Sequence, residues 1–347
     1  MTVASRTGEI DQLDLLNKLQ RILGEGAFVA TYKYALILAL AELSVEKTRA
    51  PDGSLTIPIL ELTERFVILY WRQTAPFGAA KILHQSTGQQ ASVINLIAQL
   101  RAEAPTLASA RRHRRWARLI TSVGKVLVEN PLWRLQLVGL DRLDFLYEER
   151  LIDGAVVLRP GIASFFQQQF RVVQALVQMA WLTFVQNLAP NRALLGTAGD
   201  LAEFLFGADR SGLRAIVEGL CTVQANRCFY CGRVMSADVA VDHFIPWSRY
   251  PRDLGHNFVL AHAVCNQSKR DMLAAPVHLE RWVTRTLAEP KALKEVFDGA
   301  RFMHDVDASM SVVEWSYESA ERIGAALWLR GKETCHLSPD WRRILTG

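Results

Sequence analysis

Apolar residues recur at helical spacing through most of the first hundred positions. Residues 31–46 are apolar around most of a helical surface, which indicates a central, buried helix. The segment LTERFVILYWR, residues 62–72, is either a buried helix or a buried strand, because its length suits both. Between these segments, residues 49–58 carry two prolines and a glycine and predict a loop. An earlier helix is indicated by a leucine repeat that consists of Leu13, Leu16, Leu19 and Leu23.

The middle of the chain alternates between extended and helical patterns. Residues 132–138 and 155–160 are apolar and rich in branched side chains, and they predict short strands. Residues 163–188 predict one long amphipathic helix. Residues 189–200 contain proline, asparagine and two glycines and predict a linker, followed by one or two helices over 201–225. The apolar stripe of the long helix is typical of a core and comprises Phe166, Phe170, Val173, Val177, Trp181, Phe184 and Leu188.

These patterns predict a mainly α-helical fold that contains a small α+β module. We expect a mostly helical domain over residues 1–195, which recognises a target or a partner protein. The module is expected over 200–275, and a helical C-terminal region over 276–347 packs on the other two. Four tryptophans of the second half of the chain are expected to anchor this packing: Trp282, Trp315, Trp328 and Trp341.

A basic segment between Arg101 and Arg134 is the main charge feature. Its eight Lys and Arg residues and two Glu residues give a local balance of +6. On a single helix over residues 107–128, the cations fall on one face and the apolar residues on the other. Such a stripe suits a phosphate backbone, and a solvated face that happens to be basic is the alternative. The apolar face consists of Trp116, Ile120, Val123 and Leu127, and the basic face of Arg111, Arg114, Arg115, Arg118 and Lys125.

The composition limits the class of protein. Half of the 347 residues are hydrophobic and 22% are charged, which argues against a disordered chain. The most apolar early stretch, residues 34–41, is shorter than a membrane span, and the N-terminus lacks a signal pattern. We therefore expect a cytoplasmic protein without a membrane partner. The net charge of +5 is a mild indication of an anionic partner.

Four of the potential metal ligands occur as two closely spaced pairs. Cys228 and Cys231 are separated by two residues, and so are His262 and Cys265. Each spacing allows a tight turn to direct two ligands at one ion, and three thiolates with one imidazole favour zinc. Four protein ligands leave no open position, so we expect a structural zinc ion. The two cysteines outside this pattern, Cys221 and Cys335, are expected to be core thiols.

The segment between these pairs carries polar groups that suit phosphodiester hydrolysis. VAVDHFI and NFVL predict two strands, and the residues after Cys265 predict the start of a helix. Hydrolysis needs an activated water and a cation that offsets the charge developing on the phosphate. Asp242 and Asn266 offer oxygen ligands suited to Mg²⁺ or Mn²⁺. His243 offers an imidazole that can accept a proton near neutral pH, and so act as the general base.

The order of these motifs resembles the HNH endonuclease family. The resemblance covers residues 226–275 and rests on CFYCG, VDHFIPWSRYPRD and HNFVLAHAVCNQSKRD. It implies a ββα-metal fold with His243 as general base and Asp242 as metal ligand. It also implies that Asn257 orients the loop that carries the histidine. Asn266 stands where many members have histidine, as in HNN-type members, and His262 stands where many have cysteine.

Four basic residues near the motif are candidates for contacts with the nucleic acid. Arg249 and Arg252 lie in the loop between the predicted strands, and Lys269 and Arg270 lie in the predicted helix. Each suits a phosphate contact or a solvated surface equally well. His256, beside Asn257, is expected to be a loop residue and not a second base.

The resemblance implies a metal-dependent endonuclease that cleaves DNA, most simply double-stranded, leaving 5′-phosphate and 3′-hydroxyl ends. A prokaryotic restriction or anti-phage role fits a nuclease joined to a large helical region. The alternatives are a homing or mobile-element nuclease, a non-catalytic nucleic-acid-binding protein that retains the zinc scaffold, and an effector gated by a partner. Cutting both strands with one site per chain suggests a homodimer or two successive nicks.

Overall fold

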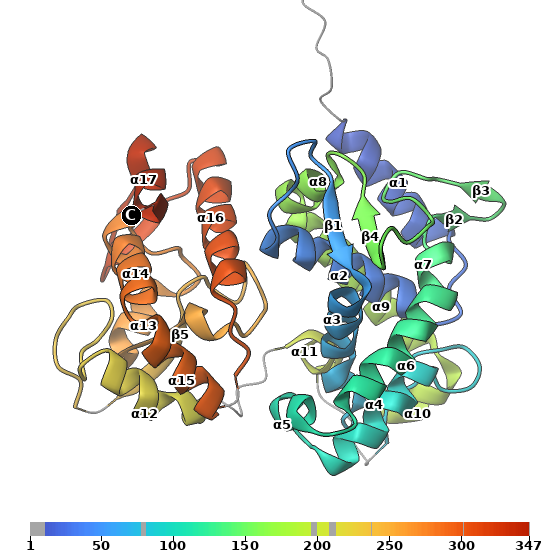
Figure 1. The fold of residues 1–347 in the computed structure, drawn as a ribbon, viewed down its shortest axis with the longest axis horizontal. Coiled ribbons are helices and arrows are strands. Elements are labelled where there is room, and N and C mark those ends of the chain that lie inside the picture. Colours follow the sequence, from blue (N-terminus) through green and yellow to red (C-terminus); the bar gives the residue numbers. More distant parts are fainter. Residues whose placement is uncertain are drawn as a thin grey trace, which may run out of the picture. The chain divides into compact units, whose positions relative to one another are not determined.

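The computed structural model describes residues 11–77, 81–195, 200–207, 213–236, 238–300 and 302–346. The chain forms two compact units, which divide between Phe206 and Gly207 (Figure 1). The division lies later than the predicted linker at 189–200, because α10 (Arg192–Leu195) and α11 (Leu201–Phe206) belong to the first unit. Residues 196–199 of that linker, and residues 208–212 of the region expected to be helical, lie outside the described residues.

The first unit is helical, with two small antiparallel sheets among its described residues. Strands β1 and β4 pair in one sheet, and β2 and β3 pair in the other. The strands are β1 (Leu55–Pro58), β2 (Leu137–Val138), β3 (Asp141–Arg142) and β4 (Ala155–Leu158). The remaining helices are α1 (Gln12–Glu25), α2 (Tyr32–Glu46), α3 (Ile59–Trp71), α4 (Ser92–Glu103), α5 (Leu107–Arg112), α6 (Trp116–Glu129), α7 (Pro131–Arg134), α8 (Ile162–Gln168) and α9 (Phe170–Asn187), with 3₁₀ turns at Arg72–Thr74 and Ala189–Asn191.

Helix α2 occupies the core of this unit, as its apolar sequence predicts. Residues 33–46 are all buried, and α3, α8 and α9 pack around the helix (Figure 1). The segment that suited a helix or a strand is helical, as α3. Its one buried cation, Arg65, bonds to Glu42 at 2.8 Å and Glu46 at 2.5 Å, so the apolar core contains a paired charge. A buried charge of this kind is retained only because it is paired.

Three predictions for the first unit are wrong in detail. Helix α1 buries Leu15, Leu19 and Ile22, whereas Leu13 of the predicted stripe is 64% exposed. The long helix over 163–188 is interrupted at Gln169, which separates α8 from α9. Residues 132–134 of the predicted strand at 132–138 belong to helix α7, and only Leu137–Val138 is extended.

Among the described residues, no single helix is long and apolar enough to cross a membrane. Only the bent pair formed by Phe170–Asn187 and Ala189–Leu195 passes the length and composition test.

The described residues of the second unit form two short antiparallel sheets, and helices pack on the first of them. Strands β5 (Val239–His243) and β6 (Phe258–His262) pair in register from Val239 opposite His262 to His243 opposite Phe258. Helix α13 (Ala263–Lys269) follows β6 directly, so the predicted order of strand, loop, strand and helix is present. The other elements are α12 (Arg214–Val223), α14 (Pro276–Ala288), α15 (Pro290–Ala300), α16 (Val306–Arg322), β7 (Leu327–Arg330), β8 (Glu333–Cys335) and α17 (Arg343–Thr346), with 3₁₀ turns η3 (Gly255–Asn257) and η4 (Pro339–Arg342).

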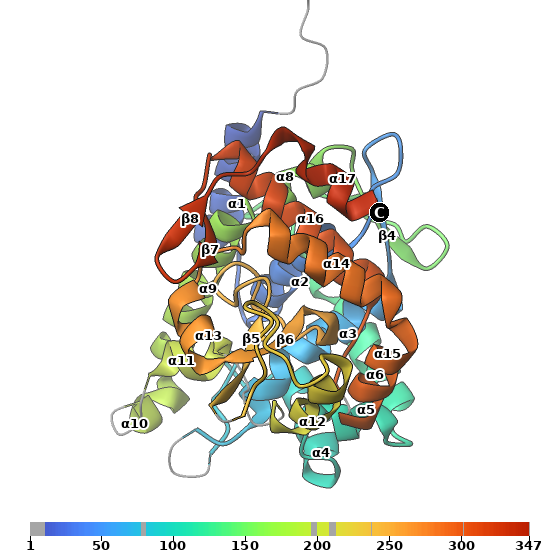
Figure 2. The same cartoon turned by 90° about the vertical axis from the view of Figure 1, so that its left-hand side faces the viewer.

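The C-terminal helices share a core with this sheet. The ring of Trp282 on α14 stacks on Phe244, just after β5, with ring centroids 5.5 Å apart. Tyr317 on α16 lies on the same cluster. Figure 1 shows α14, α16 and β5 in the same unit, and Figure 2 labels these elements together with β6. Residues 276–347 are therefore part of the same compact unit. The four predicted tryptophan anchors are buried, and the β7–β8 hairpin is an element that the helical pattern did not predict.

Candidate functional site

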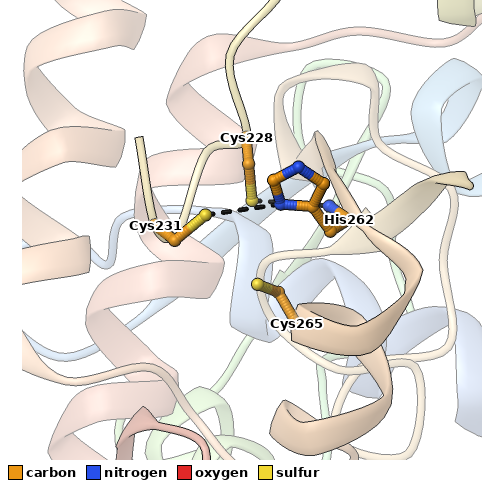
Figure 3. A group of neighbouring side chains, drawn as sticks. All are labelled: Cys228, Cys231, His262 and Cys265. Carbon is orange, nitrogen blue, oxygen red and sulfur yellow. Dashed lines mark hydrogen bonds between the residues drawn. The ribbon is translucent and has the colours of Figure 1, made fainter. Parts of the chain in front are cut away.

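The zinc-capable cluster lies where two backbone turns approach each other. Cys228 and Cys231 belong to a tight turn that closes through a hydrogen bond from Gly232 N to Cys228 O, and Gly232 adopts a positive φ of 71°. His262 ends β6 and caps α13, and Cys265 lies in the first turn of that helix. The four side chains point toward one another (Figure 3), and their ligand atoms all lie within 4.8 Å of one another.

The orientation of His262 fits metal binding. Its Nδ1 lies 3.3 Å from Cys231 Sγ, and its Nε2 lies 3.3 Å from Val234 O. Because a carbonyl only accepts hydrogen bonds, Nε2 carries the proton and the lone pair of Nδ1 faces the thiols. Metal-bound histidines commonly donate their second nitrogen in this way. Cys228, Cys231, His262 and Cys265 would therefore hold a zinc ion with a complete set of soft ligands.

The thiols of the cluster ionise unequally. Burial opposes ionisation of Cys231, but hydrogen bonds from the Arg233 backbone and from the cluster lower its pKa to about 7. Burial and the neighbouring thiols raise the pKa of Cys265 to about 12. Three adjacent thiols cannot all carry charge without a cation between them, which is the electrostatic condition that a zinc ion satisfies. By contrast, Cys221 and Cys335 are half-exposed, so the prediction that they are core thiols is wrong.

The carboxylate of Asp242 is held from two sides. The hydroxyl of Tyr230 donates to its Oδ2 at 2.5 Å, and the ammonium of Lys269 lies 3.0 Å from the same oxygen. Burial and the Asp242 charge raise the pKa of Tyr230 well above its usual value, so the phenol remains a donor. This leaves Oδ1 as the oxygen of Asp242 without a hydrogen bond to the described residues.

The prediction that Lys269 contacts a nucleic acid is wrong. Its side chain is completely buried, and its Nζ also donates to His243 O at 2.9 Å. Burial lowers its pKa, while the Asp242 carboxylate opposes that change. A buried ammonium with these two partners ties α13 to the end of β5 and cannot reach a phosphate. Asn266 lies one turn earlier on α13 and is half-buried, so it shares the helix face that Lys269 presents to β5.

His243 is the last residue of β5, and its ring is fixed on several sides. Its Nε2 lies 2.8 Å from Asp253 Oδ1. The rings of Trp247 and Phe258 lie against it, with centroid distances of 5.5 Å and 4.8 Å. The side chain of His243 is 15% exposed, so the imidazole reaches solvent from an aromatic surrounding.

Asn257 holds the backbone that follows the histidine. Its Oδ1 accepts from Ile245 N at 2.7 Å, and its Nδ2 donates to Ile245 O at 2.9 Å. Its own carbonyl accepts from Phe244 N at 2.7 Å. One buried amide thus satisfies both backbone groups of Ile245, in a loop that has left the β-ladder and has no other partner for them.

Two arginines of helix α14 donate hydrogen bonds to the backbone of both site segments, the turn after Cys228 and the start of β6. Arg281 donates to the carbonyls of Phe229 and Tyr230, and Arg285 donates to those of Phe258 and His256. Burial lowers the pKa of Arg285 to about 10. Sequence reasoning missed these arginines, because they lie 50 residues or more after the first zinc pair. It also missed Tyr230 and Asp253, although both lie inside the recognised motif.

The remaining basic residues near the motif differ in accessibility. Arg252 is buried, with its Nη2 3.6 Å from Met303 Sδ, so the prediction of a nucleic-acid contact is wrong for this residue. Arg270 is exposed at the end of α13, and Arg249 is half-buried. Contacts of these two with a phosphate remain predictions.

The predicted basic helix over 107–128 is two helices. Helix α5 ends at Arg112 and α6 begins at Trp116, so one continuous stripe does not form. Arg111 pairs with Glu64 of α3 at 2.8 Å, and Arg115 pairs with Glu103 of α4. The apolar side is largely correct, because Ile120, Val123 and Leu127 are buried and Trp116 is half-buried. Arg114, Arg118 and Lys125 of the predicted stripe are exposed, as is Arg115, which is paired with Glu103.

Comparison with known proteins identifies two segments. Residues 12–132 match a family described as a domain of unknown function (DUF8808), and residues 228–275 match the HNH endonuclease family. No curated protein and no solved structure shows significant similarity to the chain. The segment that carries the zinc-capable cluster and the Asp242–His243 pair is therefore described by the HNH endonuclease family, which points to a nuclease or hydrolase kind of activity.

Proposed function

We propose that this protein is a metal-dependent endonuclease that hydrolyses DNA phosphodiester bonds. The observation that carries the proposal is the fixed imidazole of His243 at the end of β5, within the HNH endonuclease match. The ring has one nitrogen bonded to Asp253, and it lies next in the chain to a carboxylate that is itself held in place. A positioned base beside a positioned acidic ligand is what hydrolysis of a phosphodiester requires.

His243 is the general base of the proposed reaction. Its free nitrogen takes a proton from a water molecule, whose oxygen forms a bond to phosphorus. The bond between phosphorus and the 3′ oxygen breaks, which gives 5′-phosphate and 3′-hydroxyl ends by analogy with the family. Asn257 keeps the histidine at the strand end through its two bonds to Ile245.

A hard divalent ion, Mg²⁺ or Mn²⁺, would be held by Oδ1 of Asp242 and the amide oxygen of Asn266. The donor set fits, because both atoms are neutral or anionic oxygens and Tyr230 and Lys269 hold the other oxygen of Asp242. When bound, such an ion offsets the negative charge that develops on the phosphate and on the leaving oxygen. The zinc ion of the thiol cluster would be structural, because four protein ligands leave no position for water.

A role in prokaryotic restriction or anti-phage defence fits a nuclease joined to a separate helical unit. A homing or mobile-element nuclease is the alternative biological role. Under either role the first unit recognises the target DNA or a partner protein.

A plasmid cleavage assay tests the proposal. Purified protein is incubated with unmodified and phage-modified DNA in Mg²⁺, in Mn²⁺ and in chelator. We expect metal-dependent cutting that His243→Ala lowers by at least about 10²-fold, the usual contribution of a general base. The exposed His336 lies outside the site, so His336→Ala is a matched control that cuts at the wild-type rate.

Cleavage by His243→Ala at the wild-type rate would remove this residue from the role of base. A folded, zinc-loaded wild-type protein that cuts no DNA in any of these conditions would contradict an unassisted endonuclease. That result would favour the partner-gated effector or the non-catalytic DNA-binding protein.

A further inference from the structure

Asp253 lies in the loop between β5 and β6, ten residues after His243, and its carboxylate reaches back to the histidine ring. The distance from His243 Nε2 to Asp253 Oδ1 is 2.8 Å, the length of a strong charge-assisted hydrogen bond. The side chain of Asp253 is 23% exposed, so water screens this pair only in part.

We propose that Asp253 is a positioning residue, which fixes the tautomer and the ring orientation of His243 for proton transfer. The inference rests on the proposed nuclease function, and it extends that function to a residue outside the Asp242, His243, Asn257 and Asn266 set.

The chemistry of the two groups decides which nitrogen is free. A carboxylate has no proton to donate, so Nε2 of His243 carries the proton and donates it to Asp253. The neutral ring then has its lone pair on Nδ1. No hydrogen-bond partner of Nδ1 lies among the residues that the structure describes. Nδ1 is therefore the atom that can accept a proton from water.

The aromatic neighbours of His243 restrict the ring in a second way. Phe258, its partner across the β-ladder, lies at a centroid distance of 4.8 Å and an interplanar angle of 54°. Trp247 lies at 5.5 Å with an angle of 61°. These rings limit rotation of the imidazole, but neither can choose between the two tautomers. Only the hydrogen bond to Asp253 makes that choice.

The backbone on both sides of Asp253 is anchored, so its carboxylate is preorganised. Arg252 and Leu254 are buried at 6% and 1% exposure. Gly255 N donates to Met303 O at 2.7 Å. A Cβ at Gly255 would lie 2.6 Å from the ring of Phe297, so only glycine allows this close approach. A loop held by packing before and after one acid differs from a mobile surface loop, which would not keep that acid in place.

The step that Asp253 assists is balanced without a further reactant. Water transfers one proton to Nδ1 while its oxygen bonds to phosphorus, and the bond from phosphorus to the leaving oxygen breaks. The imidazole becomes a cation next to the Asp253 carboxylate, and the attraction between the two stabilises that cation. Asp253 keeps its charge throughout and touches neither the substrate nor the reacting atoms.

Two conservative variants separate position from charge. Asp253→Asn keeps an oxygen that can accept from Nε2 but removes the charge, and Asp253→Ala removes both. We expect kcat for DNA cleavage to fall roughly 10-fold to 100-fold in Asp253→Asn and further in Asp253→Ala, with KM nearly unchanged, as for other residues that orient a catalytic histidine. Asp271→Asn, at an exposed acid of the same unit, is the matched control and should keep the wild-type kcat.

The tautomer itself is measured by ¹⁵N NMR of protein labelled at histidine, with the His243 signals assigned by their loss in His243→Ala. In the wild-type protein we expect the neutral ring to carry its proton on Nε2, and in Asp253→Ala we expect a mixture of both tautomers. This readout needs no cleavage, so it tests the inference even where the proposed function fails.

Three results would overturn the positioning role: a proton on Nδ1 in the wild type, unchanged tautomers in Asp253→Ala, or an unchanged kcat in a wild-type enzyme that cuts. Metal titration adds a fourth. If Asp253→Asn weakens the Mn²⁺ dependence of cleavage and leaves the tautomer alone, Asp253 acts as a metal ligand instead.

Discussion

Asp242 and His243 are neighbours in the chain, yet their side chains leave β5 in opposite directions and meet different partners. Asp242 faces inward to Tyr230 and Lys269, whereas His243 faces Asp253 and two aromatic rings. The alternation follows from the twofold repeat of a strand. A strand end can thus present an anchored carboxylate and a partly exposed imidazole within one dipeptide.

At the residue scale, we expect His256 to make the free energy of unfolding depend on pH. It is 4% exposed, and burial together with the nearby Arg285 and His304 lowers its pKa to about 4, below the usual 6.5. As the pH falls from 6.5 to 4, the unfolded chain binds a proton that the folded chain does not. The contribution of His256 to the free energy of unfolding is therefore fully present above pH 6.5. It is lost as the pH falls from 6.5 to 4, by up to about 3 kcal/mol.

Urea unfolding of the whole protein between pH 4 and pH 7 measures this slope. In His256→Gln, which has no titrating group at this position, the slope over the same window should be smaller. An equal slope in both proteins would assign the acid sensitivity to other groups.

At the scale of elements, α13 joins the zinc-capable cluster to strand β5. Its first turn carries Cys265, and its last residue, Lys269, bonds to Asp242 and to the carbonyl of His243. A helix of two turns is too short to be stable alone in water. The buried ion pair at one end holds the helix, and zinc ligation at the other end would add to this. We therefore expect the position of Asp242 to depend on zinc binding at the opposite end of the helix.

Zinc removal is expected to unfold this part of the protein. Cys228→Ser and Cys265→Ser should lose the bound zinc and lower the stability by on the order of several kcal/mol, because metal binding here is folding free energy. Zinc content and thermal unfolding of the full chain are the measurements. Cys335→Ser, at a half-exposed cysteine outside the cluster, is the control and should keep both values. Unchanged melting in the two cluster variants would refute the zinc assignment.

At the scale of the whole molecule, the two units contain different features. The second unit holds the candidate nuclease site, and its C-terminal helices are part of that site because Arg281, Trp282 and Arg285 of α14 bond to the backbone of both site segments. The first unit carries exposed cations on α6 and includes the match to a domain of unknown function. The ion pairs of Arg111 with Glu64 and of Arg115 with Glu103 leave fewer cations for a phosphate than the sequence indicates.

We expect the exposed cations of the first unit to contact DNA phosphates. Replacing Arg114, Arg118 and Lys125 with Gln should weaken DNA binding and reduce the slope of log K against log salt, by about 0.9 for each lost contact. Fluorescence anisotropy over a range of salt concentrations measures the slope. Arg115→Gln is the matched control, because Glu103 already pairs with that residue and the slope should change less. A slope that stays constant in the triple variant would show that this face binds something else.

The sequence by itself determined the features that depend on short spacings. The two ligand pairs, the central helix α2 and the order of strand, loop, strand and helix follow from residues a few positions apart, where chain geometry fixes which side chains share a face. The tertiary structure decided everything that depends on distant partners. Lys269 is buried beside Asp242, and the carboxylate of Asp253 lies within hydrogen-bonding distance of the His243 ring. Arg111 and Arg115 are paired with acids from other helices. The local sequence does not distinguish a charged residue that faces water from one that faces a phosphate or a buried carboxylate. Its role is set by the path of the chain, because that path alone determines which opposite charge lies within hydrogen-bonding distance.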